Sequence, residues 1–159
     1  SGTKTLGGTV TVTDDLTIDS GVTLDVVTDI NHAVTVGGDW TNNGTFEKRE
    51  GTLTLNGSND QVFTPGSSAT YYNVTINNSG TSKNVTITAA FDINNDLTLT
   101  DGTLDLDTND PGITLAGNLS IASGALWTKG DGTITFDGDT QSLSDGNTTP
   151  NNLGTIIVN

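Results

Sequence analysis

Closely spaced carboxylates are the residues of this sequence that could do chemistry in one place. Residues 105–110 read Asp-Leu-Asp-Thr-Asn-Asp, and residues 137–139 read Asp-Gly-Asp. Ca²⁺ takes about six to eight oxygen ligands, and a turn could present several of these oxygens together. Neither segment has EF-hand spacing or the Gly-Gly-x-Gly-x-Asp spacing of calcium β-rolls, and Asp in tight turns also hydrogen-bonds its own backbone without a metal. With that turn role as the alternative, the calcium candidates are Asp105, Asp107, Asp110, Asp137 and Asp139.

Carboxylate catalysis would need basic partners in the same groove. A lyase-like or glycosidase-like β-helix places pairs of Asp or Glu beside Lys or Arg, whereas this chain has 5 Lys and Arg against 19 Asp and Glu. Lys48-Arg49 recurs as Lys129-Gly130, and Lys4 recurs near Lys83, so the basic residues follow an internal repeat instead of forming one site. We therefore expect no enzymatic activity.

Three other residue groups have both a functional and an ordinary interpretation. Thr-x-Thr pairs in register on a flat sheet would form the hydroxyl rows of some ice-binding solenoids, although Thr suits any exposed strand position. Tyr71-Tyr72 could stack on a sugar, while the remaining aromatic residues fill a core and His32 lies in a surface turn. The Thr pairs begin at Thr9, Thr52, Thr86, Thr98 and Thr133, and the core aromatic residues are Trp40, Phe46, Phe63, Phe91, Trp127 and Phe136.

Asn-x-Ser/Thr sequons are frequent in this chain. Such sequons are N-glycosylation acceptors in exported proteins of a host that performs the modification, and a chain rich in Asn and Thr also contains many by chance. The possible glycosylation sites are Asn43, Asn56, Asn73, Asn77, Asn84, Asn118 and Asn147.

Composition excludes several classes of partner. The 159 residues carry a formal net charge of -14 with pI about 4.1, which disfavours nucleic acid and anionic lipid because both require Lys and Arg. No apolar run approaches the roughly 18 residues of a membrane helix, so we expect no membrane insertion. The absence of Cys excludes disulfides and thiolate metal sites.

The elements that must position these residues are short β-strands. Apolar and polar residues alternate with period two, β-branched residues predominate, and turn pairs such as Asp-Gly and Asn-Gly separate the runs. This order argues against the disorder that low hydrophobicity and high charge would otherwise suggest. Strands are predicted at 10–12, 16–18, 22–24, 34–36, 53–55, 74–76, 85–87, 97–99, 104–106, 113–115, 134–136 and 156–158, with no helix.

The sequence repeats itself once. EGTLTLNG at 50–57 returns as DGTITFDG at 131–138, 81 positions later, and flanking runs match at the same or a similar offset. We interpret the chain as a single domain, residues 1–159, of two internal repeats, 1–81 and 82–159, each a block of four coils. An antiparallel sandwich is the alternative, but strands of three residues are marginal in hairpins and adequate when each stacks on the coils above and below.

The repeat phrases resemble those of long bacterial surface proteins. Gly38-Asp39-Trp40-Thr41-Asn42-Asn43-Gly44-Thr45-Phe46 and Thr52-Leu53-Thr54-Leu55-Asn56-Gly57 are similar in style to the β-solenoid stalks of filamentous-haemagglutinin-like and autotransporter-like adhesins. The resemblance covers nearly the whole chain and involves no catalytic motif. It implies a right-handed parallel β-helix located outside the cell or on the cell surface, used as a stalk, adhesin or fibre.

We therefore predict an all-β, right-handed parallel β-solenoid without capping elements, working as an extracellular structural repeat. About eight coils would make a rod of roughly 4 nm. Uncapped ends expose backbone groups that recruit another chain, so the expected partner is a second copy, head to tail, or a neighbouring repeat of the same chain. The alternatives are a glycan-binding adhesin module and an ice-binding protein, and no cofactor is expected beyond possible calcium. The predicted edges are Thr9, Val10, Thr11 and Val12 at one end, and Ile156, Ile157 and Val158 at the other.

Overall fold

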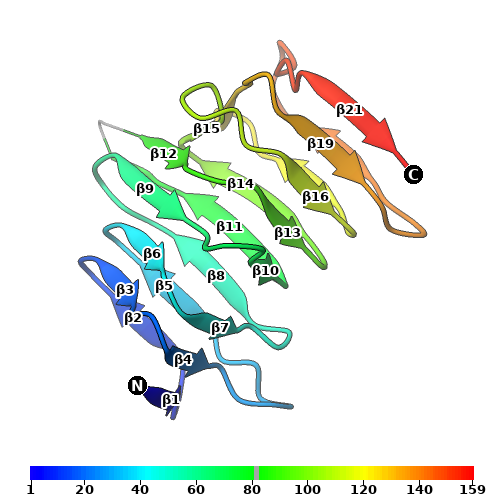
Figure 1. Ribbon diagram of the computed structural model, residues 1–159. Helices are drawn as coiled ribbons and strands as arrows, with labels where there is room; N and C mark the ends of the chain where they lie inside the picture. The colour runs from blue at the N-terminus through cyan, green and yellow to red at the C-terminus, as the bar shows by residue number, and fades with distance from the viewer. Residues whose placement is uncertain (81–82) are drawn as a thin grey trace.

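The chain is an all-β solenoid of about 7 turns (Figure 1). The computed structural model describes residues 1–80 and 83–159, so the predicted repeat boundary between residues 81 and 82 lies outside the described residues. Within those two ranges there is no helix, and every strand pairing is parallel. The fold class predicted from the alternating pattern is confirmed, while the right-handed sense stays a prediction.

Each turn presents its strands on three faces, which we number in chain order. Face 1 consists of β2 (Val10–Val12), β5 (Val34–Val36), β8 (Thr52–Leu55), β11 (Asn73–Asn77), β14 (Leu97–Asp101), β17 (Leu119–Ile121) and β20 (Leu143–Asp145). Face 2 consists of β3 (Leu16–Ile18), β6 (Trp40–Asn42), β9 (Gln61–Thr64), β12 (Asn84–Ile87), β15 (Thr103–Asp105) and β18 (Leu126–Thr128).

Face 3 is divided into two sheets. The first contains β1 (Gly2–Thr5), β4 (Val22–Asp25) and β7 (Thr45–Glu47). The second contains β10 (Thr70–Tyr71), β13 (Phe91–Ile93), β16 (Ile113–Leu115), β19 (Thr133–Phe136) and β21 (Thr155–Val158). The break between β7 and β10 therefore interrupts one face and leaves the other two continuous.

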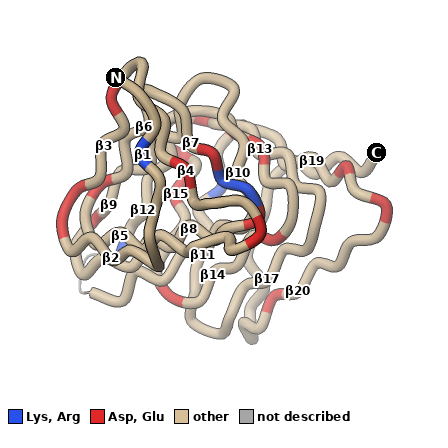
Figure 2. Tube along the Cα trace, turned by 90° about the horizontal axis from the view of Figure 1, so that it is seen from below, with Lys and Arg blue, Asp and Glu red and all other residues tan. Residues whose placement is uncertain are grey.

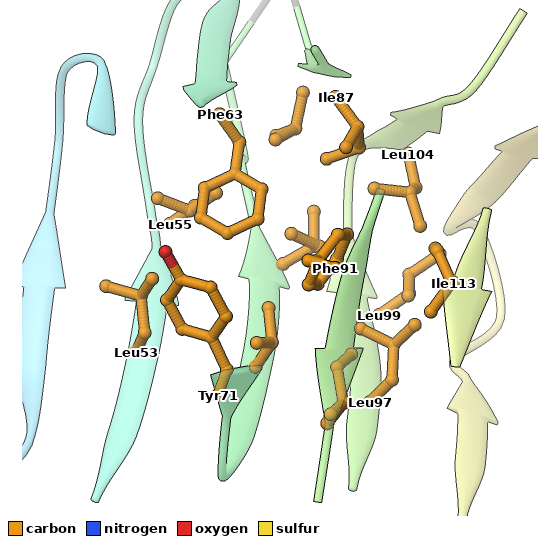
Figure 3. Close-up of a cluster of buried hydrophobic side chains, with 14 of the residues drawn as sticks. Leu53, Leu55, Phe63, Tyr71, Ile87, Phe91, Leu97, Leu99, Leu104 and Ile113 are labelled. Carbon is orange, nitrogen blue, oxygen red and sulfur yellow. The ribbon is translucent and has the colours of Figure 1, made fainter. Parts of the chain in front are cut away.

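The core is a column of inward side chains, one layer per turn. Alternate residues of each strand point to opposite sides, so Leu53 and Leu55 are buried while Thr54 between them is half-buried. Parallel pairing stacks like positions, and Leu53 lies between Val34 and Val74 of the neighbouring turns. Figure 3 shows part of this column, in which side chains from all three faces meet.

An aromatic cluster fills the core where face 3 is interrupted. The Trp40 Nε1–H donates to the Tyr71 hydroxyl at 2.9 Å, and that hydroxyl donates to the Pro65 carbonyl at 2.9 Å. The Phe46 ring lies 5.0 Å from Trp40 and 5.7 Å from Tyr71 between ring centroids. Tyr71 is 0% exposed, so it is a core residue, and the sugar-stacking alternative considered for it is wrong.

The two repeats do not occupy equivalent faces. Leu53 lies in β8 on face 1, whereas Ile134, its match at offset 81, lies in β19 on face 3. The same shift holds throughout the chain: strands of face 1 in the first repeat match face 3 in the second, those of face 2 match face 1, and those of face 3 match face 2.

The repeat is eleven strand positions long. Strands β1 to β9 match β12 to β20 in order, β10 matches residues 151–152, and β11 matches β21. At three positions per turn this is three and two-thirds turns, so the predicted block of four coils is wrong. In the match of β11 with β21, the inward residues Val74 and Ile76 correspond to Ile156 and Val158 at offset 82, because Ile156 and Val158 pair with the buried residues Ile134 and Phe136.

Candidate functional site

The core is open at the N-terminal end of the stack. A hollow of about 210 Å³ lies there, lined mainly by apolar side chains. Val10 and Val12 on β2 are only half-buried, whereas Val34 and Val36, their partners one turn further along, are 0% exposed. The hollow is also lined by Lys4, Leu6, Leu16, Thr17, Ile18, Val22 and Leu24.

The core is open in the same way at the C-terminal end. A second hollow of about 210 Å³ is lined by residues including Phe136, Leu143, Ile156 and Val158. Ile156 and Val158 pair with the buried residues Ile134 and Phe136, so they occupy inward positions, yet they are 40% and 77% exposed. These apolar side chains would be covered by one further turn of solenoid.

Strand edges surround both hollows. Among the described residues β1, β2 and β3 have strand neighbours on one side only, and so do β20 and β21 at the opposite end (Figure 1). The predicted edge residues 10–12 and 156–158 are therefore in edge strands, and Thr9 immediately precedes β2. Coaxial stacking with matching faces would not bring these two strands together, because β2 lies on face 1 and β21 on face 3.

The segment 146–154 covers one strand edge at the C-terminal end, which the sequence did not predict. The Asn151 Oδ1 accepts from the Trp127 N–H at 3.0 Å, and the Asn147 Oδ1 accepts from the Gly124 N–H at 2.8 Å. Asp145 orders this segment by accepting hydrogen bonds from the backbone N–H groups of Asn151 and Asn147. These hydrogen bonds also lower the pKa of the Asp145 carboxyl to about 2. Face 2 therefore ends here in side-chain hydrogen bonds instead of a strand.

Two glutamines that sequence reasoning missed hold the turns of the solenoid. The Gln61 side-chain amide is buried and donates to the carbonyls of Val36 and Gly38 in the turn below. The Gln141 amide donates to Leu115 and Gly117 in the same manner. Their spacing of 80 residues, each shortly after a Gly turn, was the signal in the sequence.

The calcium candidates lie in two separate turns. Asp105 accepts from the Asp107 N–H at 3.0 Å and from the Thr108 hydroxyl at 3.0 Å, and Asp110 accepts from the Asp131 N–H at 2.6 Å. No group of three or more His, Asp or Glu side chains able to hold a metal occurs in residues 1–80 and 83–159. Figure 2 shows Asp and Glu spread around the outline of the solenoid. These contacts support the turn role, and calcium binding at these residues stays an untested alternative.

The turn at Asp105 has a counterpart in the first repeat. Asp25 accepts from the Val27 N–H at 2.9 Å, as Asp105 does from Asp107. The Arg49 guanidinium, which donates to both carboxylate oxygens of Asp25, holds the pKa of that carboxyl below its usual range. Asp25 ends a face 3 strand and Asp105 ends a face 2 strand, so the same type of turn occurs at two different corners of the solenoid.

The sequons differ in accessibility. The side-chain amides of three donate within the solenoid: Asn73 to Thr52, Asn118 to Asp96, and Asn147 to Ala125. Asn77 is half-buried in β11. Asn43, Asn56, Asn84 and Asn118 are exposed, and these four sequons have the most accessible acceptors.

Hydroxyl side chains form one column along face 1. The predicted Thr-x-Thr pairs are distributed over all three faces, but consecutive strand pairings align the central outward residues of face 1. Asn73, Asp96 and Asn118 lie beside this column, where they interrupt a second row of hydroxyl side chains. The column consists of Thr11, Thr35, Thr54, Thr75, Thr98, Ser120 and Ser144.

The remaining predictions concern single residues. The predicted core aromatic residues are buried, except for half-buried Phe46. His32 is half-buried in the turn after β4, and its N–H donates to the Val26 carbonyl.

Comparison with known proteins gives no relative: no family model, curated protein or solved structure matches the chain. Within the described residues, no helix is long and apolar enough to cross a membrane. The fold is that of a parallel β-solenoid with a repeat-like structure.

Proposed function

We propose that this chain is a structural segment of an extracellular fibre or stalk, in which β-solenoid units stack end to end. The units are second copies of the chain or neighbouring repeats of one longer chain. This proposal rests on the two open ends, where apolar inward side chains and strand edges are exposed together. The resemblance of its repeat phrases to bacterial surface stalks supports a location outside the cell.

Stacking satisfies both kinds of exposed group at once. Another turn placed on Ile156 and Val158 removes apolar surface from water, which stabilises by about 25 cal/mol per Å². The same turn pairs the backbone N–H and C=O groups of the edge strand. Contact between opposite ends of identical units is heterologous, so it continues into a filament unless the rotation closes.

The test compares a single copy with a chain that carries two copies in tandem. Sedimentation of the single copy at rising concentration, with electron microscopy, is expected to show rods that lengthen in steps of one unit. Val158→Asp should block this growth because it places a charge in the apolar hollow, while the outward substitution Thr114→Asp should not. A single copy that stays monomeric, together with a tandem chain that behaves as two independent domains, would contradict the proposal.

Ice binding is the second candidate, favoured by the unbroken hydroxyl column on face 1. Thermal hysteresis that is lost in Thr54→Leu and Thr75→Leu would establish it. The structural proposal predicts no hysteresis, and it also predicts no selective signal on a glycan array.

A further inference from the structure

We infer that a second copy of this chain docks on the C-terminal end turned by one face, so that its β1 pairs with β20 and its β3 pairs with β21. This inference rests on the proposed end-to-end stacking and specifies its geometry. It follows from a junction that the chain already contains, the one between its own two repeats.

The internal junction consists of three strand pairings. The first repeat ends with β9, β10 and β11, and the second begins with β12, β13 and β14. β12 stacks on β9, β13 on β10 and β14 on β11, each in parallel. The chain thus shows how the beginning of one repeat covers the end of the preceding one.

The repeat correspondence transfers this junction to the ends of the chain. The exposed C-terminal elements β20, residues 151–152 and β21 match β9, β10 and β11. The exposed N-terminal elements β1, β2 and β3 match β12, β13 and β14. A second copy with β1 over β20, β2 over residues 151–152 and β3 over β21 therefore reproduces all three internal contacts.

The rotation by one face follows from the number of strand positions from β1 to β21. The described strands, with residues 151–152 counted as one more, fill 22 positions, which is one more than seven full turns. The first strand of a following copy therefore falls on face 1, although β1 lies on face 3 in its own copy. Docking without rotation would put β2 on β20, and β1 would then compete with β21 for the same place.

The internal register predicts the residues that meet. Val74, Thr75 and Ile76 pair with Leu97, Thr98 and Leu99, so Ile156, Ile157 and Val158 should meet Leu16, Thr17 and Ile18 of the second copy. Likewise Gln61 and Phe63 pair with Val85 and Ile87, which places Lys4 and Leu6 of the second copy on Gln141 and Leu143.

The two ends are complementary in character. Leucine, isoleucine and valine line both hollows, so apolar side chains meet across most of the junction. Each end also has one charge at an inward strand position: Lys4 aligns with Leu24 at the N-terminal end, and Asp145 aligns with Ile121 at the C-terminal end. The two charges are opposite, which favours contact between unlike ends over contact between like ends.

Cysteine cross-linking tests this geometry, because the chain has no cysteine of its own. Neighbouring strands lie about 4.8 Å apart, a Cα separation that a disulfide spans. Ile157→Cys protein is mixed with an equal amount of Thr17→Cys protein under mild oxidation, and mixed-disulfide dimers are identified by mass. In parallel, Ile157→Cys is mixed with Thr3→Cys, which reports stacking of β1 on β21, and with Thr11→Cys, which reports stacking of β2 on β21. Sedimentation of each unoxidised mixture measures assembly independently.

The Thr17→Cys mixture is expected to yield mixed dimers at least tenfold above the other two, and Ser142→Cys with Thr5→Cys should cross-link as well. Preferential linkage to Thr3→Cys or Thr11→Cys, or equal linkage to all three in mixtures that assemble, would overturn the rotated geometry and leave end-to-end stacking intact. If sedimentation shows no assembly in any mixture, both the stacking proposal and this geometry fail for the free chain.

Discussion

Leu53 and Ile134 hold the same place in two copies of one sequence phrase, yet they lie on different faces of the solenoid. Both are buried core residues with threonines on either side. Leu53 belongs to face 1 and Ile134 to face 3. The same strand-turn phrase can therefore occur on any face, because each face requires the same alternation of apolar and polar residues and the same kind of turn.

The buried glutamine should contribute more to stability than its counterpart near the open end. Gln61→Leu leaves the carbonyls of Val36 and Gly38 without their side-chain donor, which should lower the free energy of unfolding by about 1–3 kcal/mol. Gln141→Leu should cost less, since Gln141 is only half-buried. Urea denaturation measures both, and equal losses would contradict this account of the turns.

The hydroxyl of Tyr71 should matter for folding. Tyr71→Phe leaves the buried Trp40 indole N–H without its acceptor, at a cost of about 1–3 kcal/mol. Tyr72→Phe is the matched control, because Tyr72 is half-buried, and its unfolding free energy should stay within about 0.5 kcal/mol of the wild type. Similar losses in both variants would place the effect outside the aromatic cluster.

Acid should weaken the segment that covers face 2. The folded pKa of Asp145 is about 2, below the unfolded value of about 3.9. Its contribution is therefore fully present above about pH 4 and is lost as the pH falls toward 2. Between pH 5 and pH 2.5 the Tm of Asp145→Asn should fall less than that of the wild type, measured by circular dichroism; parallel curves would contradict the assignment.

Calcium should leave the stability of the chain unchanged. The oxygens of Asp105 and Asp110 are engaged by backbone and hydroxyl donors. A specific site at one hundred times its Kd would add about 2.7 kcal/mol, so calorimetry with calcium and then with EDTA would detect it. A rise in Tm that EDTA reverses, and that Asp105→Asn abolishes, would establish a site.

The positions of the strands were predictable from the sequence, whereas the face on which each strand lies was not. Alternation located strands such as β8 and β19, because burial of every second residue shows in the sequence itself. The face on which a strand lies depends on how many strands precede it. The number of preceding strands cannot be counted from the sequence, because the turns differ in length and segments such as 65–69 and 146–154 are irregular. The sequence offset therefore matched Leu53 with Ile134 correctly, but a repeat of four whole coils would have placed them on one face, and they lie on two.

The open ends could be inferred only in part. Ile156 and Val158 are in an edge strand, as expected, but the cover over β18 depends on Asn147 and Asn151. Their side chains are ordinary turn residues in the sequence. The partner of β21 also required the face assignment, because β3 and β2 are equally good strands by composition.

The most direct test of end-to-end stacking is the length of two copies joined from Asn159 to Ser1, measured by small-angle X-ray scattering. With about 4.8 Å per turn, one copy spans about 3.5 nm along the axis. End-to-end stacking predicts a single rigid rod of about 7 nm for the tandem chain, with a higher Tm than one copy because one junction has been added. Two compact bodies with a flexible connection and an unchanged Tm would contradict it.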